Sequence, residues 1–126
     1  MIIKEILSIL KQDAELTELL EATNKNTKIY MNETTFQGDC IVYTYTQLIN
    51  DKIKAQSRIE VDCISSDYEK GSLILKRVQE LLLTLGDEPA TENIIEINQN
   101  GGGHLFDKEI KLHKLKAIFS IKEKVR

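Results

Sequence analysis

The feature that most constrains the fold is a strand pattern that runs directly into a helix pattern. Apolar and polar side chains alternate over residues 58–65, as in a strand with one buried face. Ser66 and Glu69 then have the spacing of a capping box, with Asp67 as a competing helix cap. An apolar stripe follows over residues 67–85. The sequence therefore predicts a half-buried strand and an amphipathic helix that folds back onto its sheet.

The other elements follow from apolar periodicity and from β-branched and aromatic content. A helix is predicted over residues 2–12, with a further helical turn or two after the cap Asp13. Strands are predicted over residues 28–31, 40–49, 54–64, 93–98 and 108–122. The breaks between elements are a hairpin turn at Asn50-Asp51-Lys52, a helix cap at Gly86 and a flexible break at Asn100-Gly101-Gly102-Gly103. The order is α-β-β-β-α-β-β. We expect an α+β fold, with an antiparallel sheet of four to five strands packed against two helices, in a single domain over residues 1–126.

The last predicted strand has an irregular apolar pattern. Its apolar face carries Leu115, Ala117, Phe119 and Ile121. Ile110 and Leu112 have the opposite parity. Two explanations stay open: a bulge near His113, or a sheet whose other face is also covered at that point.

Composition limits the class of protein. The 126-residue chain has a net charge of -3, with 41% hydrophobic and 29% charged residues. These values are ordinary for a soluble globular protein, and they disfavour a DNA-coating or membrane-surface protein, which would carry a basic excess. Charges inside the first apolar stretch argue against a signal peptide, and no apolar run has the length of a membrane span. Two distant cysteines do not predict a disulfide framework, so a reduced cytosolic setting is expected.

The glycine run Gly101–Gly103 and the following His104 are the first candidate binding site. An anion cradle needs glycines ahead of a helix N-terminus, with a Walker or GxGxxG motif, whereas a strand pattern follows here. We therefore expect a mobile hairpin loop, which would become ordered when a partner binds.

No metal site is predicted. Cys40, Cys63, His104 and His113 lack the close CxxC or HxxxH pairs of structural zinc sites. Cys63 falls on the apolar face of its strand and fits a small core residue.

Catalysis is not predicted either. Nothing in the sequence ties a histidine to a nucleophile and an orienting third group. The carboxylates of Glu60, Asp62 and Glu96 lie at polar positions of alternating strands, where solvated charges are the default. We expect neither an enzyme nor a bound cofactor.

Tyr43 and Tyr45 share one face of a predicted strand with Ile41 and Ile49. Core packing is the simpler interpretation of this face. An intersubunit contact is the alternative, because aromatic residues are enriched at interfaces. Stacking on single-stranded nucleic acid would need basic residues among the aromatics, whereas these strands carry Thr.

The order of elements resembles the tail terminator (tail completion) proteins of long-tailed bacteriophages, a small family of head–tail joining proteins. The patterns that carry the resemblance are the N-terminal Ile/Leu helix, Lys28-Ile29-Tyr30, Cys40-Ile41-Val42-Tyr43, Arg58-Ile59-Glu60-Val61-Asp62-Cys63-Ile64-Ser65 running into a helix after Asp67-Tyr68, and Lys116-Ala117-Ile118-Phe119-Ser120-Ile121. The family typically shows an Ile-x-Val-Asp strand, a small polar turn and a long helix. This chain lacks the Pro that often precedes the Tyr-rich strand, and residues 35–39 stand in its place.

The resemblance implies a structural virion protein that works through binding geometry. Such proteins form a hexameric ring that caps the last ring of tail-tube subunits, ends tube polymerisation and offers a docking surface to the head connector. Double-stranded DNA passes through the lumen without sequence-specific binding. The implied partners are further copies of the chain, the tube protein, the connector and the sheath, with no membrane involved. Assembly would take place in the bacterial host cytoplasm, and the product would lie in the tail or neck of the virion.

The contact residues expected under this interpretation lie on the tyrosine strand, the first hairpin and the glycine run. They are Tyr43, Tyr45, Asn50, Asp51, Lys52, Gly101, Gly102, Gly103 and His104, with loops 33–39 and 99–107 ordering against the partners. Two alternatives stay open. One is another structural subunit of a phage neck, tail or contractile tail-like particle. The other is a small cytosolic enzyme or ligand-binding α+β domain, which would show a pocket with convergent polar groups.

Overall fold

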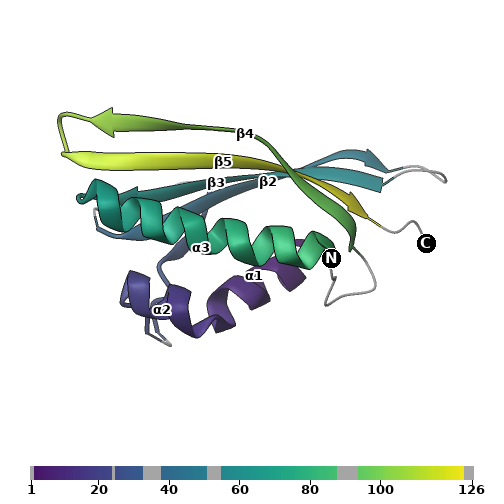
Figure 1. Cartoon of the computed structure of the whole chain (residues 1–126), viewed down its shortest axis with the longest axis horizontal. Helices are drawn as coiled ribbons and strands as arrows, with labels where there is room; N and C mark the ends of the chain where they lie inside the picture. Colours follow the sequence, from purple (N-terminus) through teal and green to yellow (C-terminus); the bar gives the residue numbers. More distant parts are fainter. Residues whose placement is uncertain (1, 24, 33–37, 51–54, 88–93, 124–126) are drawn as a thin grey trace.

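Three helices cover one face of a five-stranded sheet in the computed structural model (Figure 1). The structure describes residues 2–23, 25–32, 38–50, 55–87 and 94–123. The elements are α1 (Ile2–Gln12), α2 (Ala14–Leu20), β1 (Ile29–Met31), β2 (Cys40–Asn50), β3 (Ala55–Ser65), α3 (Tyr68–Asp87), β4 (Ile94–Asp107) and β5 (Leu112–Glu123). The predicted α+β class is confirmed, and so is the strand that runs directly into the long helix.

The strands lie side by side in the order β1-β2-β3-β5-β4. Every neighbouring pair is antiparallel except β1 and β2, where Ile29 pairs with Ile41 in parallel. We predicted a wholly antiparallel sheet, so the parallel pairing of β1 with β2 corrects that prediction. The order places β5 between β3 and β4, although β5 follows both of them in the chain.

The N-terminal region forms the helix α1 and a short second helix α2, and the prediction that Asp13 caps this second helical segment is confirmed. The carboxylate of Asp13 accepts a hydrogen bond from the backbone N–H of Leu16 at 2.9 Å and so caps α2. The same carboxylate forms an ion pair with Arg77 on α3, with a distance of 2.6 Å between Oδ1 and Nη2. Hydrogen bonds from Arg77 lower the pKa of the Asp13 carboxyl. One acidic side chain therefore starts α2 and ties it to α3.

The main core fills the space between the helices and the sheet. Its fully buried members include Ile6, Leu10, Leu16, Leu20, Ile41, Ile59, Val61, Ile74, Val78, Leu82, Phe119 and Ile121. The helices supply these residues at helical spacing, and the strands supply every second residue. The apolar periodicities read from the sequence therefore identify the face on which helices and sheet meet.

A smaller apolar cluster lies on the opposite, outer face of the sheet. It contains Cys40, Val42, Ile64 and Leu112, with Tyr30 packed against it. Leu112 is therefore buried in this outer cluster, whereas Ile110 lies in the turn before β5 and is 39% exposed. Because β3 pairs with β5 without a break in register, the irregular pattern comes from a second covered patch and not from a bulge near His113.

The long helix α3 begins after Asp67, the competing cap, and extends beyond residue 85, where the predicted helix ended. The Asp67 carboxylate accepts a hydrogen bond from the Glu69 N–H at 3.0 Å, so Asp67 and not Ser66 is the cap. At the other end, α3 continues through Gly86 to Asp87, and the prediction of Gly86 as the helix cap was wrong.

The glycine run lies within strand β4, and the prediction of a flexible loop over residues 99–107 was wrong. Gly101, Gly102 and Gly103 pair with Ile118, Ala117 and Lys116 of β5. A Cβ on Gly102 would lie 2.7 Å from the backbone oxygen of Lys116, so the close approach of the two strands requires a glycine there. A register shift between Gln99 and Gly101 accompanies the run.

The true hairpin turn covers residues 108–111, which had been assigned to the last strand. The carboxylate of Asp107 accepts a hydrogen bond from the Glu109 N–H at 3.0 Å, and Lys111 adopts a positive φ of 54°. This turn therefore has local chemistry that closes the β4–β5 hairpin, and β5 starts at Leu112.

Candidate functional site

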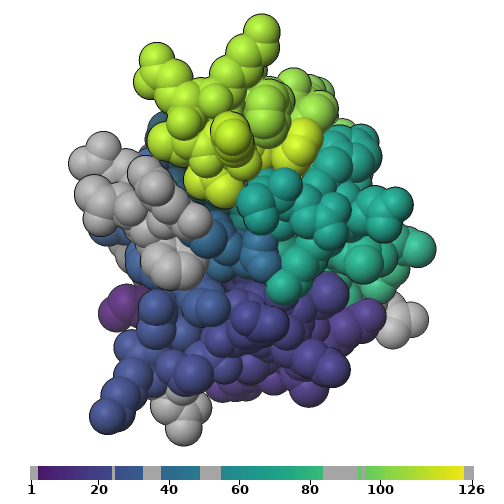
Figure 2. All heavy atoms as spheres, turned by 90° about the vertical axis from the view of Figure 1, so that its left-hand side faces the viewer, coloured from purple at the N-terminus to yellow at the C-terminus, as the bar shows by residue number. Residues whose placement is uncertain are grey.

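A group of rings and large apolar side chains gathers at the turn end of the β4–β5 hairpin, beside the start of α3. This hairpin-end surface consists of Tyr68, His104, Leu105, Phe106, Ile110 and His113. Leu105 is 64% exposed, Tyr68 48% and Phe106 41%. Figure 2 shows this end of the molecule, with the yellow-green hairpin next to the teal start of α3. Large apolar side chains kept in water at one place are typical of a protein-contact surface.

Strand register brings the rings together. Phe106 lies directly opposite His113, and His104 lies opposite Leu115, so all three rings share the helix-covered face of the sheet. The ring centroids of Phe106 and His113 are 4.6 Å apart, and those of His104 and His113 are 5.1 Å apart. Tyr68, the first residue of α3, meets His104 edge-on with centroids 4.9 Å apart. The cap at the start of α3 thus places a tyrosine against the hairpin.

Leu105 lies on the other side of the same hairpin. It pairs with Lys114 and faces a shallow depression of about 400 Å³ on the outer sheet face. The depression is lined by Asp62, Gly102, Gly103, His104, Leu105, Lys114 and Lys116. The hairpin end therefore offers apolar side chains on both of its faces.

The charges beside this depression are paired across strands. The Nζ atom of Lys116 lies 3.8 Å from a Glu60 carboxylate oxygen and 3.9 Å from an Asp62 carboxylate oxygen. Burial raises the pKa of Asp62, and the nearby lysines oppose that rise. This geometry is that of a partly exposed ion-pair cluster and does not form an acid–base dyad aimed at a bound substrate.

The two tyrosines of β2 lie on the core side of the sheet. Tyr43 is 8% exposed and belongs to the main core. Tyr45 is half-buried against that core, and its hydroxyl lies 3.5 Å from a carboxylate oxygen of Glu123. Burial raises the pKa of the Tyr45 hydroxyl. Core packing therefore describes Tyr43, whereas Tyr45 remains partly exposed.

The described members of the remaining predicted contact set lie at two separate places. Asn50 ends β2 opposite Ala55, at the far end of the sheet from the hairpin-end surface. Asp51 and Lys52 lie outside the residues that the structure describes, as does most of the 33–39 loop. Of the predicted set, only Gly101–Gly103 and His104 belong to the β4–β5 hairpin.

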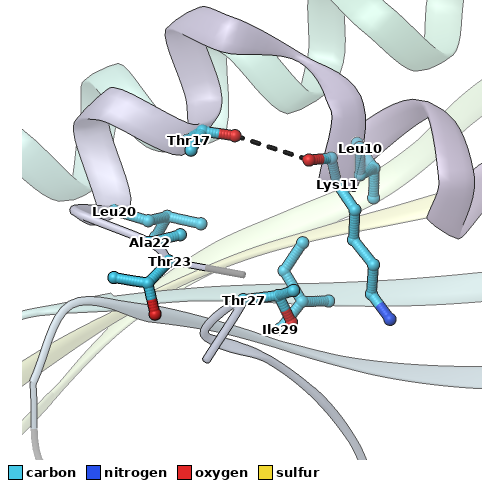
Figure 3. Close-up of a pocket in the computed structure, with 8 residues that line it drawn as sticks. All are labelled: Leu10, Lys11, Thr17, Leu20, Ala22, Thr23, Thr27 and Ile29. Atoms are coloured by element: carbon cyan, nitrogen blue, oxygen red, sulfur yellow. Dashed lines mark hydrogen bonds between the residues drawn. The ribbon is translucent and has the colours of Figure 1, made fainter. Parts of the chain in front are cut away.

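A second hollow of about 240 Å³ lies between α1, α2 and β1 (Figure 3). Leu10, Leu20, Ala22 and Ile29 supply apolar walls, and the hydroxyl of Thr17 donates a hydrogen bond to the backbone oxygen of Lys11 at 3.4 Å. Among the described residues that line it there is no acid, histidine or cysteine. The hollow therefore offers burial for a small apolar group.

The two cysteines are buried on opposite faces of the sheet. Cys63 lies in the main core, as predicted, and Cys40 lies in the outer cluster. Burial raises the pKa of the Cys40 thiol to about 11 and also raises that of Cys63. Such thiols do not serve as ready nucleophiles.

Among the residues whose placement is described, no group of three or more His, Cys, Asp or Glu side chains is arranged to hold a metal ion. Within those same ranges, no helix combines the length and apolar character that a membrane crossing requires.

Sequence reasoning missed most of the hairpin-end surface. Leu105 and Phe106 are adjacent in a strand, so they must point to opposite faces, and only one of those faces is covered by the helices. That signal was hidden because residues 99–107 were interpreted as a loop. Ile110 was likewise assigned to a strand, although the flanking Asp107 carries a turn signal.

No family model matches the chain, and no curated protein matches it. A solved structure does resemble it: a chain described as part of the virion of a native gene transfer agent particle. The match has a TM-score of 0.69 and covers 94% of this chain and 90% of that chain, with 12% sequence identity. At that identity the likeness shows a shared fold over nearly the full length.

Proposed function

We propose that this protein is a structural component of a phage-type virion, and more specifically a tail terminator. It would form a ring on the end of the tail tube, stop further tube growth and join the tail to the head connector. The observation that carries the virion role is the shared fold with a chain of a gene transfer agent virion over 94% of the sequence. The terminator role rests on the order of elements and the local patterns that resemble that family.

The described surface supports a function based on contact. Leu105 and Phe106 are exposed apolar residues at the hairpin end, and they suit burial against another protein. The buried thiols and the cross-strand ion pairs give no support to a catalytic role, and we infer a protein that acts without chemistry of its own. Its partners would be further copies of the chain, the tube protein, the connector and, in a contractile tail, the sheath.

A closed ring needs two different surfaces on each subunit, because a head-to-tail contact repeats until the rotation closes. The sheet has two unlike edges: β1, with three residues, and β4, with fourteen. The hairpin-end surface continues the longer edge. We infer that this end contacts a neighbouring subunit or the tube, and that six copies surround a lumen through which DNA passes.

The test is electron microscopy of the purified protein, alone and mixed with tail tubes from the same genome. Six-fold rings, or a cap confined to one tube end that blocks elongation, are expected. A protein that ignores tubes at high concentration would refute the proposal. A protein that binds elsewhere in the neck or tail would instead favour another structural subunit of the particle.

A matched pair of variants tests the surface. Leu105→Asp places a charge on the hairpin end, whereas Leu48→Asp does so on a residue that is 49% exposed at the far end of the sheet. We expect the first to abolish capping and the second to retain it, with both variants folded by circular dichroism. Equal capping by both would remove the hairpin end from the interface.

A further inference from the structure

The chain has two histidines, and the structure brings them into contact. They lie nine residues apart in sequence, on either side of the β4–β5 turn. The distance between His104 Nε2 and His113 Nδ1 is 2.9 Å. In that contact one nitrogen donates its proton and the other accepts it.

The backbone around the pair is held by the hairpin. Both residues lie where β4 and β5 pair in continuous register, from Gly101 to Asp107 on β4, and the Asp107 carboxylate closes the turn between them. Tyr68 and Phe106 pack against the rings, with centroids 4.6 to 5.7 Å away. The two imidazoles therefore face one another before any ligand arrives, which lowers the ordering cost of binding.

This spacing is close to that of two nitrogen ligands on one metal ion. With metal–nitrogen bonds of about 2.0–2.1 Å, two ligands at a right angle are separated by roughly 2.9 Å and two tetrahedral ligands by roughly 3.3 Å. To share an ion, both side chains would rotate out of their mutual hydrogen bond, and the ring that donates would carry its proton on its other nitrogen, so that both nitrogens present lone pairs to the metal. We propose that His104 and His113 chelate a late first-row divalent cation, with copper(II), nickel(II) and zinc(II) as the candidates.

The ligand type favours these ions over magnesium or calcium, which prefer oxygen. Because the described residues place no third metal ligand nearby, the other coordination positions would be taken by water or by a group from another molecule. The general order of stability predicts that copper(II) binds more tightly than nickel(II) or zinc(II). The site does not depend on the proposed tail function.

The test is calorimetric titration of the intact protein with copper(II), nickel(II) and zinc(II) chloride. Proton NMR of the imidazole signals accompanies it and reports on these two residues alone. We expect one ion per chain, shifts of both imidazole signals and reversal by a chelator. His104→Asn and His113→Asn should each weaken binding by at least about tenfold, because either change leaves a single imidazole. Leu48→Ala, at the far end of the sheet from the two histidines, should bind as the unmodified protein does.

Three results would overturn the proposal. The first is the absence of binding at millimolar metal. The second is unchanged affinity in both histidine variants while their circular dichroism and melting behaviour remain those of the parent protein. The third is a titration in which the metal shifts only one of the two imidazole signals, which would mean that the two histidines do not share the ion.

Discussion

Replacing Phe119 by alanine tests which face of strand β5 carries the core. Phe119 is fully buried on β5, and a Phe-to-Ala change at such a site removes about 3–5 kcal/mol from the free energy of unfolding. A domain of this kind has a total of about 5–15 kcal/mol, so the variant would be marginally stable. Its neighbour Ile118 points to the outer face, where it is half-buried opposite Gly101. Ile118→Ala should therefore cost only about 1 kcal/mol.

Urea denaturation followed by circular dichroism measures both variants against the parent protein. The m-value should stay the same, so that the shift in midpoint reports stability. The comparison needs protein concentrations at which the chain is monomeric. If Ile118→Ala were as destabilising as Phe119→Ala under those conditions, the outer face would be packed as tightly as the face that the helices cover. That result would refute a core that lies mainly between the helices and the sheet.

Three further changes test local features. Gly102→Ala should lower the free energy of unfolding by more than about 1 kcal/mol, because the new Cβ would lie 2.7 Å from a backbone oxygen. Gly103 has open space around it, so Gly103→Ala should change that free energy by no more than about 0.5 kcal/mol. Equal effects of the two changes in urea denaturation would contradict the strand pairing. Because the pKa of Asp13 is lowered, its contribution to stability is present above the ordinary carboxyl pKa and is lost as pH falls. The Asp13→Asn variant should therefore lose less stability than the parent protein between about pH 5 and pH 2, as measured by unfolding at a series of pH values. Both cysteine thiols should resist a thiol reagent in the native protein and react fully in denaturant, and rapid native labelling would contradict their burial.

Apolar periodicity was sufficient to predict the helices and most strands, because burial on one face leaves a repeat in the sequence. Helix α1 was predicted to the residue, and the strand that ends at Ser65 was predicted within one residue. The β1 strand was found, but its parallel pairing was not, since three residues carry no information on direction.

The errors concentrate in the last hairpin, which also holds the candidate surface. Glycines normally signal a break, yet here a close backbone approach inside the sheet requires Gly102. Once the run was interpreted as a loop, the turn at 108–111 was taken for strand. The contact between His104 and His113 depends on cross-strand register, and register is a property of the fold that spacing along the chain does not reveal.

The position of β5 has a consequence for synthesis. Both neighbours of this strand, β3 and β4, precede it in the chain, so they cannot be joined before residues 112–123 have left the ribosome. Until then β3 exposes the edge that β5 will occupy, and the helices have only part of a sheet to pack against. Completion of this sheet is therefore a late event, and a nascent chain stalled before Leu112 would display an open, adhesive edge in place of a finished subunit.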